Sequence, residues 1–264
     1  MSDFFSNEES ILNNNFIKNG YAICRIENQD SINWIKNFYL KKIEVILEKK
    51  INDSDILNNF HKYIKLKDLN RYRLKLINEI NKSKLYKQHY YKIAKKYLEI
   101  LVGNELVMQK SINLSIQLPK DNSSLLEVHA DTWSGDSPFE VVVWLPLVDC
   151  YKTKSMYILP ANRYDKFLKK FKSSHTKKNF NLYKSIENDL KWIDIKFGEV
   201  LLFNQNLPHG NIVNKVNETR WTNNCRFKSI FTPYGDKKIG EFFQPITLRA
   251  ASKIGMNYKL PLEK

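Results

Sequence analysis

The spacing of apolar residues changes at about Glu105, and this change constrains the fold more than any other feature. In segment 111–119 (SINLSIQLP) every second residue is apolar, which predicts a strand with one apolar and one polar face. Further strands are predicted over 125–130, 139–145, 155–159, 192–195, 199–203, 210–213 and 219–232. Eight short strands with irregular spacing predict a double-sheet jelly roll rather than alternating β/α units.

The region of the chain before Glu105 has mostly helical spacing. A short strand is predicted within 19–26, and helices are predicted over 31–50, 55–66 and 83–101. No repeat or low-complexity linker follows, so we expect one domain over 1–264, α+β in class and mainly β. Its mostly helical N-terminal region, residues 1–104, is expected to pack on one sheet of the jelly-roll core, 105–264, and a Lys-rich helical insertion is expected at about 162–190.

The net charge of +15 comes mainly from lysine, since only seven of the 43 basic residues are arginine. Sites that read nucleic acid or bind phosphate in a bidentate manner favour arginine. We therefore expect a solvated Lys surface and no nucleic-acid partner, although such a surface also attracts an anionic small substrate.

Three cysteines lie far apart without a CxxC pair, which indicates neither a disulfide framework nor a structural zinc site. The acidic N-terminal segment MSDFFSNEES does not resemble a signal peptide, and no apolar run approaches the ~20 residues of a membrane span. We expect a cytoplasmic protein that does not enter the membrane. Its oligomeric state does not follow from the sequence.

A set of metal-ligand residue types lies at predicted strand ends. His129 and Asp131 are two residues apart, so both side chains project from one face of the predicted strand. His209 follows another predicted strand, although a hydrogen-bonded or solvated loop histidine is the commoner explanation when it is taken alone. Two imidazoles and one carboxylate on one face of a metal leave three positions open, an arrangement that suits Fe(II) and O2.

The predicted strand after His209 supplies a candidate anchor for an organic acid. Arg220, Thr222, Asn224 and Arg226 share one face by alternation. A guanidinium group pointing into a barrel can bind a carboxylate with two parallel hydrogen bonds. The alternative for either arginine is a structural ion pair with a protein carboxylate.

With HAD at 129–131, HGN at 209–211 and TRW at 219–221, the chain resembles the non-haem Fe(II), 2-oxoglutarate-dependent dioxygenases, specifically the phytanoyl-CoA dioxygenase-like branch. The run HADTWSGDSPFEVVVWLPLVDCYKTKSMYILP is similar to oxygenases of bacterial surface-carbohydrate and aminoglycoside-type sugar gene clusters. This resemblance implies Fe(II) on His129, Asp131 and His209, O2 as oxidant, and 2-oxoglutarate on Arg220, with Arg226 as second choice. It assigns no catalytic side chain beyond the metal centre.

Other polar and aromatic residues are weaker candidates. Asn113 and Gln117 are expected to contact the co-substrate and Ser115 the substrate, although ordinary hydrogen bonding inside the barrel explains them equally well. Trp133 is expected either to stack on a sugar ring or to pack under a loop. The lysines of the insertion either cover the mouth of the site or form a solvated helix face; they are Lys166, Lys169, Lys170, Lys172, Lys177 and Lys178.

The predicted function is oxidation of a sugar, nucleotide-sugar or surface-glycan precursor. Hydroxylation is the default, with desaturation, epimerisation and alcohol oxidation as variants. The alternatives are a cupin-like metal-dependent isomerase or lyase, a non-catalytic carbohydrate-binding protein and a nucleic-acid-binding protein.

Overall fold

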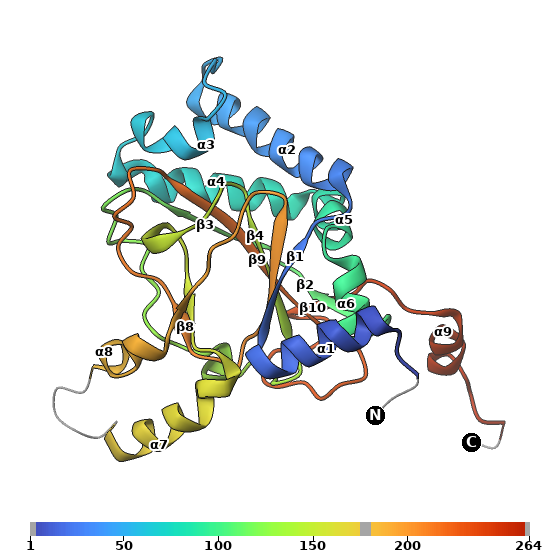
Figure 1. The fold of residues 1–264 in the computed structure, drawn as a ribbon. Coiled ribbons are helices and arrows are strands. Elements are labelled where there is room, and N and C mark those ends of the chain that lie inside the picture. The colour runs from blue at the N-terminus through green and yellow to red at the C-terminus, as the bar shows by residue number, and fades with distance from the viewer. Residues whose placement is uncertain (1–3, 175–180, 262–264) are drawn as a thin grey trace.

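Two antiparallel sheets form the centre of the molecule in the computed structural model, which describes residues 4–174 and 181–261 (Figure 1). The larger sheet has the order β1-β7-β4-β9-β2-β10, with β3 paired to β9, and the smaller sheet has the order β6-β5-β8. The strands are β1 (Tyr21–Arg25), β2 (Leu106–Gln109), β3 (Asn113–Gln117), β4 (Val141–Pro146), β5 (Tyr157–Ile158), β6 (Lys191–Trp192), β7 (Glu199–Asn204), β8 (His209–Gly210), β9 (Arg220–Ser229) and β10 (Phe243–Pro245). The predicted α+β jelly-roll fold is confirmed.

Helices cover one side of the larger sheet and also lie beside the smaller one (Figure 1). They are α1 (Asn7–Asn19), α2 (Gln29–Leu47), α3 (Ile56–Asn59), α4 (Leu69–Lys82), α5 (Lys84–Lys92), α6 (Lys95–Leu101), α7 (Tyr164–Ser174), α8 (Leu182–Ile186) and α9 (Ala250–Met256). The helices α2 to α5 lie over the sheet, whereas α7 and α8 lie beside β8. The segment predicted as a Lys-rich helical insertion contains α7 and α8 over its described residues, which exclude Lys177 and Lys178. No helix of the described ranges is both long and apolar enough to cross a membrane.

The boundaries of several elements differ from the predictions because local hydrogen bonds interrupt regular structure. The predicted strand 125–130 is mostly irregular, since the side chain of Asn211 accepts from the backbone N–H of Leu126 at 2.6 Å in place of a backbone carbonyl. Only His129 in that segment forms a β-bridge, with His209. The predicted helix 83–101 is interrupted at Ala94, and the predicted helix 55–66 is reduced to α3 and a 3-10 turn. The elements α1, α4, α9, β2 and β10 were not predicted from the sequence.

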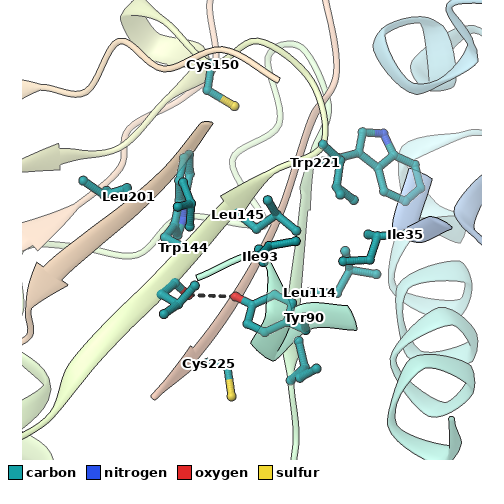
Figure 2. Close-up of a cluster of buried hydrophobic side chains, with 14 of the residues drawn as sticks. Ile35, Tyr90, Ile93, Leu114, Trp144, Leu145, Cys150, Leu201, Trp221 and Cys225 are labelled. Carbon is teal, nitrogen blue, oxygen red and sulfur yellow. Dashed lines mark hydrogen bonds between the residues drawn. The ribbon is translucent and has the colours of Figure 1, made fainter. Parts of the chain in front are cut away.

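The core lies between the helical layer and the larger sheet (Figure 2). The apolar strand β4 is buried along its whole length, and the hydroxyl of Tyr90 donates to the carbonyl of Val143 at 2.8 Å. On the face of β9 toward the helices, the indole of Trp221 donates to the carbonyl of Leu57 at 2.9 Å. The helices and the barrel therefore share one continuous core.

Strand β9 presents different chemistry on its two faces. Trp221 and Asn223 contact the helical layer, where the hydroxyls of Tyr39 and Tyr86 both donate to the amide oxygen of Asn223. Alternate residues of the same strand contact the opposite side, where Arg220 meets Ser115. The alternation predicted for this strand is therefore present, and it directs the arginine side chains into the barrel.

Candidate metal centre

The potential ligand atoms of His129, Asp131 and His209 all lie within 4.8 Å of one another. Within the described ranges, these residues form the one group of three His, Cys, Asp or Glu side chains close enough to hold a metal ion. Asp131 and His209 are buried, whereas the His129 side chain is 34% exposed. Sequence reasoning thus selected the residues that the fold brings together.

Backbone hydrogen bonds hold these residues in place. The N–H of His129 donates to the carbonyl of His209 at 3.0 Å, and the N–H of His209 donates back at 2.8 Å. Asp131 begins a 3-10 helix, and its N–H donates to the carbonyl of Gln205 at 3.1 Å. All three candidate ligands are therefore fixed to segment 205–209, which joins the larger sheet to the smaller one.

Both imidazoles are oriented through their Nδ1 atoms. Nδ1 of His129 lies 2.7 Å from the carbonyl oxygen of Glu127, and Nδ1 of His209 lies 2.8 Å from that of Leu207. A carbonyl oxygen only accepts, so each Nδ1 carries a hydrogen, and in a neutral imidazole Nε2 then has a free lone pair. Metal-binding histidines are commonly fixed in this way.

The pKa of His209 is lowered to about 4, mainly by burial; the carboxylate of Asp131 opposes this shift, and the neighbouring His129 adds to it. At neutral pH the His209 imidazole is therefore uncharged. An uncharged imidazole with a free Nε2 is the form that binds a metal ion.

Asp131 presents its two carboxylate oxygens to different partners. Oδ1 lies 3.7 Å from Nε2 of His129, while Oδ2 accepts from Nη2 of Arg226 at 2.9 Å. The guanidinium group of Arg226 also donates from Nε to the side chain of Gln205 at 2.9 Å. The second candidate for a co-substrate anchor thus contacts a candidate metal ligand.

Arg220 lies in a different environment. It is 3% exposed; Nη1 donates to the carbonyl of Ser155 and Nη2 to the hydroxyl of Ser115, both at 3.1 Å. Burial lowers its pKa to about 10, and Asp121 acts on it in the opposite direction. The guanidinium remains charged at neutral pH. Among the described residues, however, no carboxylate lies within ion-pair distance of it.

Several buried polar atoms around Arg220 also lack a hydrogen-bond partner among the described residues. They are Nε of Arg220, Oγ of Ser155 and Oε1 of Gln117, which faces Arg220 across the β3–β9 pair. A buried cation and unpaired polar atoms are costly unless a further group satisfies them. A dicarboxylate such as 2-oxoglutarate fits this chemistry, because one carboxylate would pair with the guanidinium.

The remaining predicted residues are more dispersed. Asn113 is exposed and donates to Asn224. Trp133 is 48% exposed and stacks on Phe167 and Phe171 of α7, with ring centroids 6.4 and 6.1 Å apart. The insertion therefore packs against the segment that carries Asp131.

The lysines of α7 are partly engaged in contacts within the insertion. Lys166 forms an ion pair with Asp189 at 2.8 Å, and Lys170 donates to the carbonyl of Ser185. Lys169 and Lys172 are exposed.

Sequence reasoning missed three residues of the site, namely Ser155, Gln205 and Gly210. A Cβ at Gly210 would lie 2.6 Å from the carbonyl oxygen of Leu126 and 2.6 Å from the hydroxyl of Tyr157. The HGN motif contained a signal for this close approach, since glycine is common where two backbones meet. No comparable pattern marks Ser155 or Gln205.

Comparison with solved structures places this architecture among known folds. The chain is similar to the nickel complex of the non-haem monooxygenase ThoJ, with 14% identity over 88% of this chain and 82% of that chain and a TM-score of 0.54. It is similar to HygX from Streptomyces hygroscopicus, described with nickel and 2-oxoglutarate bound, with 12% identity over 89% and 90% of the chains and a TM-score of 0.55. The chain has the fold of 2-oxoglutarate-dependent non-haem iron enzymes.

A third structure shows that enzymes with this fold differ in reaction. SnoN, a non-haem α-ketoglutarate-dependent epimerase from nogalamycin biosynthesis, matches with 12% identity over 86% and 85% of the chains and a TM-score of 0.52. No family model and no curated protein sequence matches the chain.

Proposed function

We propose that the protein is a non-haem Fe(II), 2-oxoglutarate-dependent oxygenase that acts on a small molecule of sugar type. The observation that carries this proposal is the convergence of His129, Asp131 and His209. Two imidazoles with free Nε2 atoms and one carboxylate are the donor set of such iron centres, and the fold agrees with it.

Different residues of the chain would bind the iron and the 2-oxoglutarate. His129, Asp131 and His209 would hold the iron on one face, and Arg220 would bind the distal carboxylate of 2-oxoglutarate. Ser115, Ser155 and Gln117 lie around that guanidinium and would complete the polar contacts. Fe(II) and 2-oxoglutarate, when bound there, would supply the activation of O2 for oxidation of a substrate.

The apolar strand β4 would limit the access of water from one side of the site. The buried strand β4 pairs with both β7 and β9, so apolar residues form the sheet beside the two arginines. Exclusion of water protects a reactive site from side reactions.

The proposed sugar substrate rests on Trp133. This indole is half-exposed, lies two residues after a candidate ligand and is held by the aromatic face of α7. An aromatic ring with one open face can stack on the C–H groups of a sugar ring. The fold neighbour SnoN, from nogalamycin biosynthesis, acts as an epimerase, so either epimerisation or hydroxylation is compatible with this proposal.

The decisive experiment uses metal-free protein under anaerobic conditions. Fe(II) is added first and 2-oxoglutarate second, while the visible absorption of the iron–2-oxoglutarate chelate is recorded. We expect the band in wild type, its loss in His209→Ala and a weaker 2-oxoglutarate affinity in Arg220→Ala. His89→Ala is the matched control, because His89 lies on α5 in the helical layer, where it contacts Ser31 and Trp34.

Two outcomes would contradict the proposal. Wild type that binds no metal would remove the metal centre. Bound metal without a 2-oxoglutarate band would favour the cupin-like isomerase or lyase instead.

A further inference from the structure

Arg226 has a hydrogen-bond environment unlike that of Arg220. Its Nη2 donates to Oδ2 of Asp131 at 2.9 Å, its Nε to Oε1 of Gln205 at 2.9 Å and its Nη1 to Oε1 of Gln109 at 3.2 Å. Every nitrogen of this guanidinium therefore has an acceptor within the protein. Asp136, which is also paired with Lys237, lies 3.4 Å from Nε and adds a second carboxylate on the same side.

Gln205 forms hydrogen bonds with both members of the Asp131–Arg226 pair. Its carbonyl accepts the backbone N–H of Asp131 and its Oε1 accepts from Arg226. Its Nε2 donates to the carbonyl of Ser137 at 2.9 Å and to Oε2 of Glu140 at 2.8 Å. The Gln205 side chain is completely buried and all its polar atoms are paired, so it cannot rotate without breaking these bonds.

This network decides how Asp131 can bind a metal ion. Because Arg226 occupies Oδ2, Oδ1 is the oxygen that faces His129 and the proposed metal position. A carboxylate that binds through one oxygen, together with two imidazoles, uses three of six octahedral positions. A carboxylate that binds through both oxygens would use a fourth.

The number of remaining positions matters for the proposed reaction, on which this inference rests. A chelating 2-oxo acid needs two positions and O2 needs one, so three must remain open. We propose that Arg226 is a positioning residue, held by Gln205, that keeps Asp131 a one-oxygen ligand and so preserves the position required by O2. In this assignment Arg220 anchors 2-oxoglutarate and Arg226 does not.

The test replaces Arg226 and measures three binding steps separately. Arg226→Met removes the guanidinium, Arg226→Lys retains the charge but not the planar array of donors on three nitrogens, and Gln205→Leu removes the support of the pair. Arg249→Met is the matched control, because Arg249 is paired with Glu99 and more than half exposed. Circular dichroism and thermal melting establish that each variant is folded before its binding is interpreted.

Fe(II) affinity, 2-oxoglutarate affinity at saturating Fe(II), and the affinity of the Fe(II)–2-oxoglutarate protein for nitric oxide are measured without O2. Nitric oxide serves as a probe of the last open position, read from its electron paramagnetic resonance signal. We expect Arg226→Met to lower Fe(II) affinity about tenfold and to weaken nitric oxide binding by a similar factor. Its 2-oxoglutarate affinity should equal that of wild type, Arg226→Lys should restore some of the loss, and Gln205→Leu should resemble Arg226→Met.

The outcomes that overturn this inference differ from those that overturn the proposed function. Loss of 2-oxoglutarate affinity in Arg226→Met with unchanged nitric oxide binding would make Arg226 the co-substrate anchor. If folded Arg226→Met binds Fe(II), 2-oxoglutarate and nitric oxide with the affinities of wild type, Arg226 has only a structural role. Wild type that binds neither Fe(II) nor 2-oxoglutarate would instead refute the proposed function itself.

Discussion

Gly210, the residue after His209, lies against the loop that leads to His129. The space that a side chain would need is filled by the carbonyl oxygens of Leu126 and Glu127 and by the hydroxyl of Tyr157. Two of these atoms are backbone, so they move only if the loop moves. The distance between the two candidate histidine ligands therefore depends on the absence of a Cβ at this position.

Gly210→Ala should separate β8 from the loop. We expect a loss of about 1 to 3 kcal/mol in the free energy of unfolding, because an extra methyl group is forced into a packed contact. Metal affinity should fall as well, since the His129–His209 bridge would open. Chemical denaturation and metal titration measure the two effects. Gly255→Ala is the control, because nothing lies within 4 Å of a Cβ at that position, and an equal effect there would contradict the explanation.

The depressed pKa of His209 predicts how stability of the metal-free protein depends on pH. The folded pKa of about 4 lies below the ordinary value of 6.5, so the unfolded chain takes up the proton first as the pH falls. Stability associated with the neutral imidazole is complete above pH 6.5 and is lost progressively down to pH 4.

Between pH 6.5 and pH 4, the free energy of unfolding should decrease by about 3 kcal/mol because of His209. The measurement is the free energy of unfolding of wild type and of His209→Asn from pH 7.5 to 4. The variant should lack this component of the pH dependence. Parallel curves for the two proteins would show that His209 does not titrate in this way.

At the scale of single elements, α7 is held on the molecule by its aromatic face. Phe167 is buried among Leu159, Ile186 and their neighbours, and it stacks on Trp133 from the segment that bears Asp131. The opposite face carries exposed lysines. The helix is therefore amphipathic. Phe167 belongs to a small cluster distinct from the main core, while Tyr164 at the start of the helix packs against both clusters.

Phe167→Ala should detach α7 without unfolding the sheets. We expect a local loss of about 3 kcal/mol, because a buried phenyl ring is removed from a small cluster. Hydrogen–deuterium exchange should become faster in segment 164–173 and remain unchanged in β4, β7 and β9. Lys169→Ala, on the exposed face of the same helix, should leave exchange as in wild type. Faster exchange throughout the sheets would show that α7 belongs to the main cooperative unit.

Helices and strands were predicted where the local pattern of apolar residues is strong, and they were missed where it is weak. Strands β3 and β4 were predicted because their alternation or apolar run is continuous. The helix α1 was missed because none of its residues is buried, so no apolar stripe marks it. Segment 125–130 has strand composition, yet the side chain of Asn211 interrupts its ladder, and a contact across 85 residues leaves no local pattern.

At the scale of the whole molecule, a buried polar contact joins the helical layer to the barrel. Asn223 of β9 accepts from Tyr39 of α2 at 3.0 Å and from Tyr86 of α5 at 2.8 Å. Its amide nitrogen donates to the carbonyl of Asn113 at 3.0 Å. Since the surrounding core is also continuous, we expect the helical N-terminal region and the jelly roll to unfold together.

Asn223→Ala should lower the free energy of unfolding by about 2 to 3 kcal/mol, because the buried hydroxyls of Tyr39 and Tyr86 lose Asn223 as acceptor and only one of them can still donate to the other. Tyr86→Phe is the control and should cost about 1 kcal/mol, since Tyr39 still donates to Asn223. Calorimetry of wild type should show one transition that coincides with the loss of helical circular dichroism. Two transitions would mean that the helical N-terminal region folds as a separate domain.

Only part of the candidate site could be predicted from the sequence. His129, Asp131, His209 and Arg220 were selected because residue type, strand position and motif agreed. The partner of Arg226 could not be predicted, because it depends on how the loop between β3 and β4 folds back onto segment 205–209. Ser155 contributes its backbone carbonyl to Arg220, and a backbone contact leaves no signature in residue type.

Strand β9 also has a consequence for changes in chain length. Arg220 and Arg226 lie on one face, six residues apart, while Trp221 and Asn223 occupy the other. A single-residue insertion between Arg220 and Arg226 would reverse the faces of all residues after it. A two-residue insertion would keep the faces but move Arg226 about 7 Å along the strand, beyond reach of Asp131. The strand thus fixes the distance between the two guanidinium groups, and any insertion or deletion between them would change that distance.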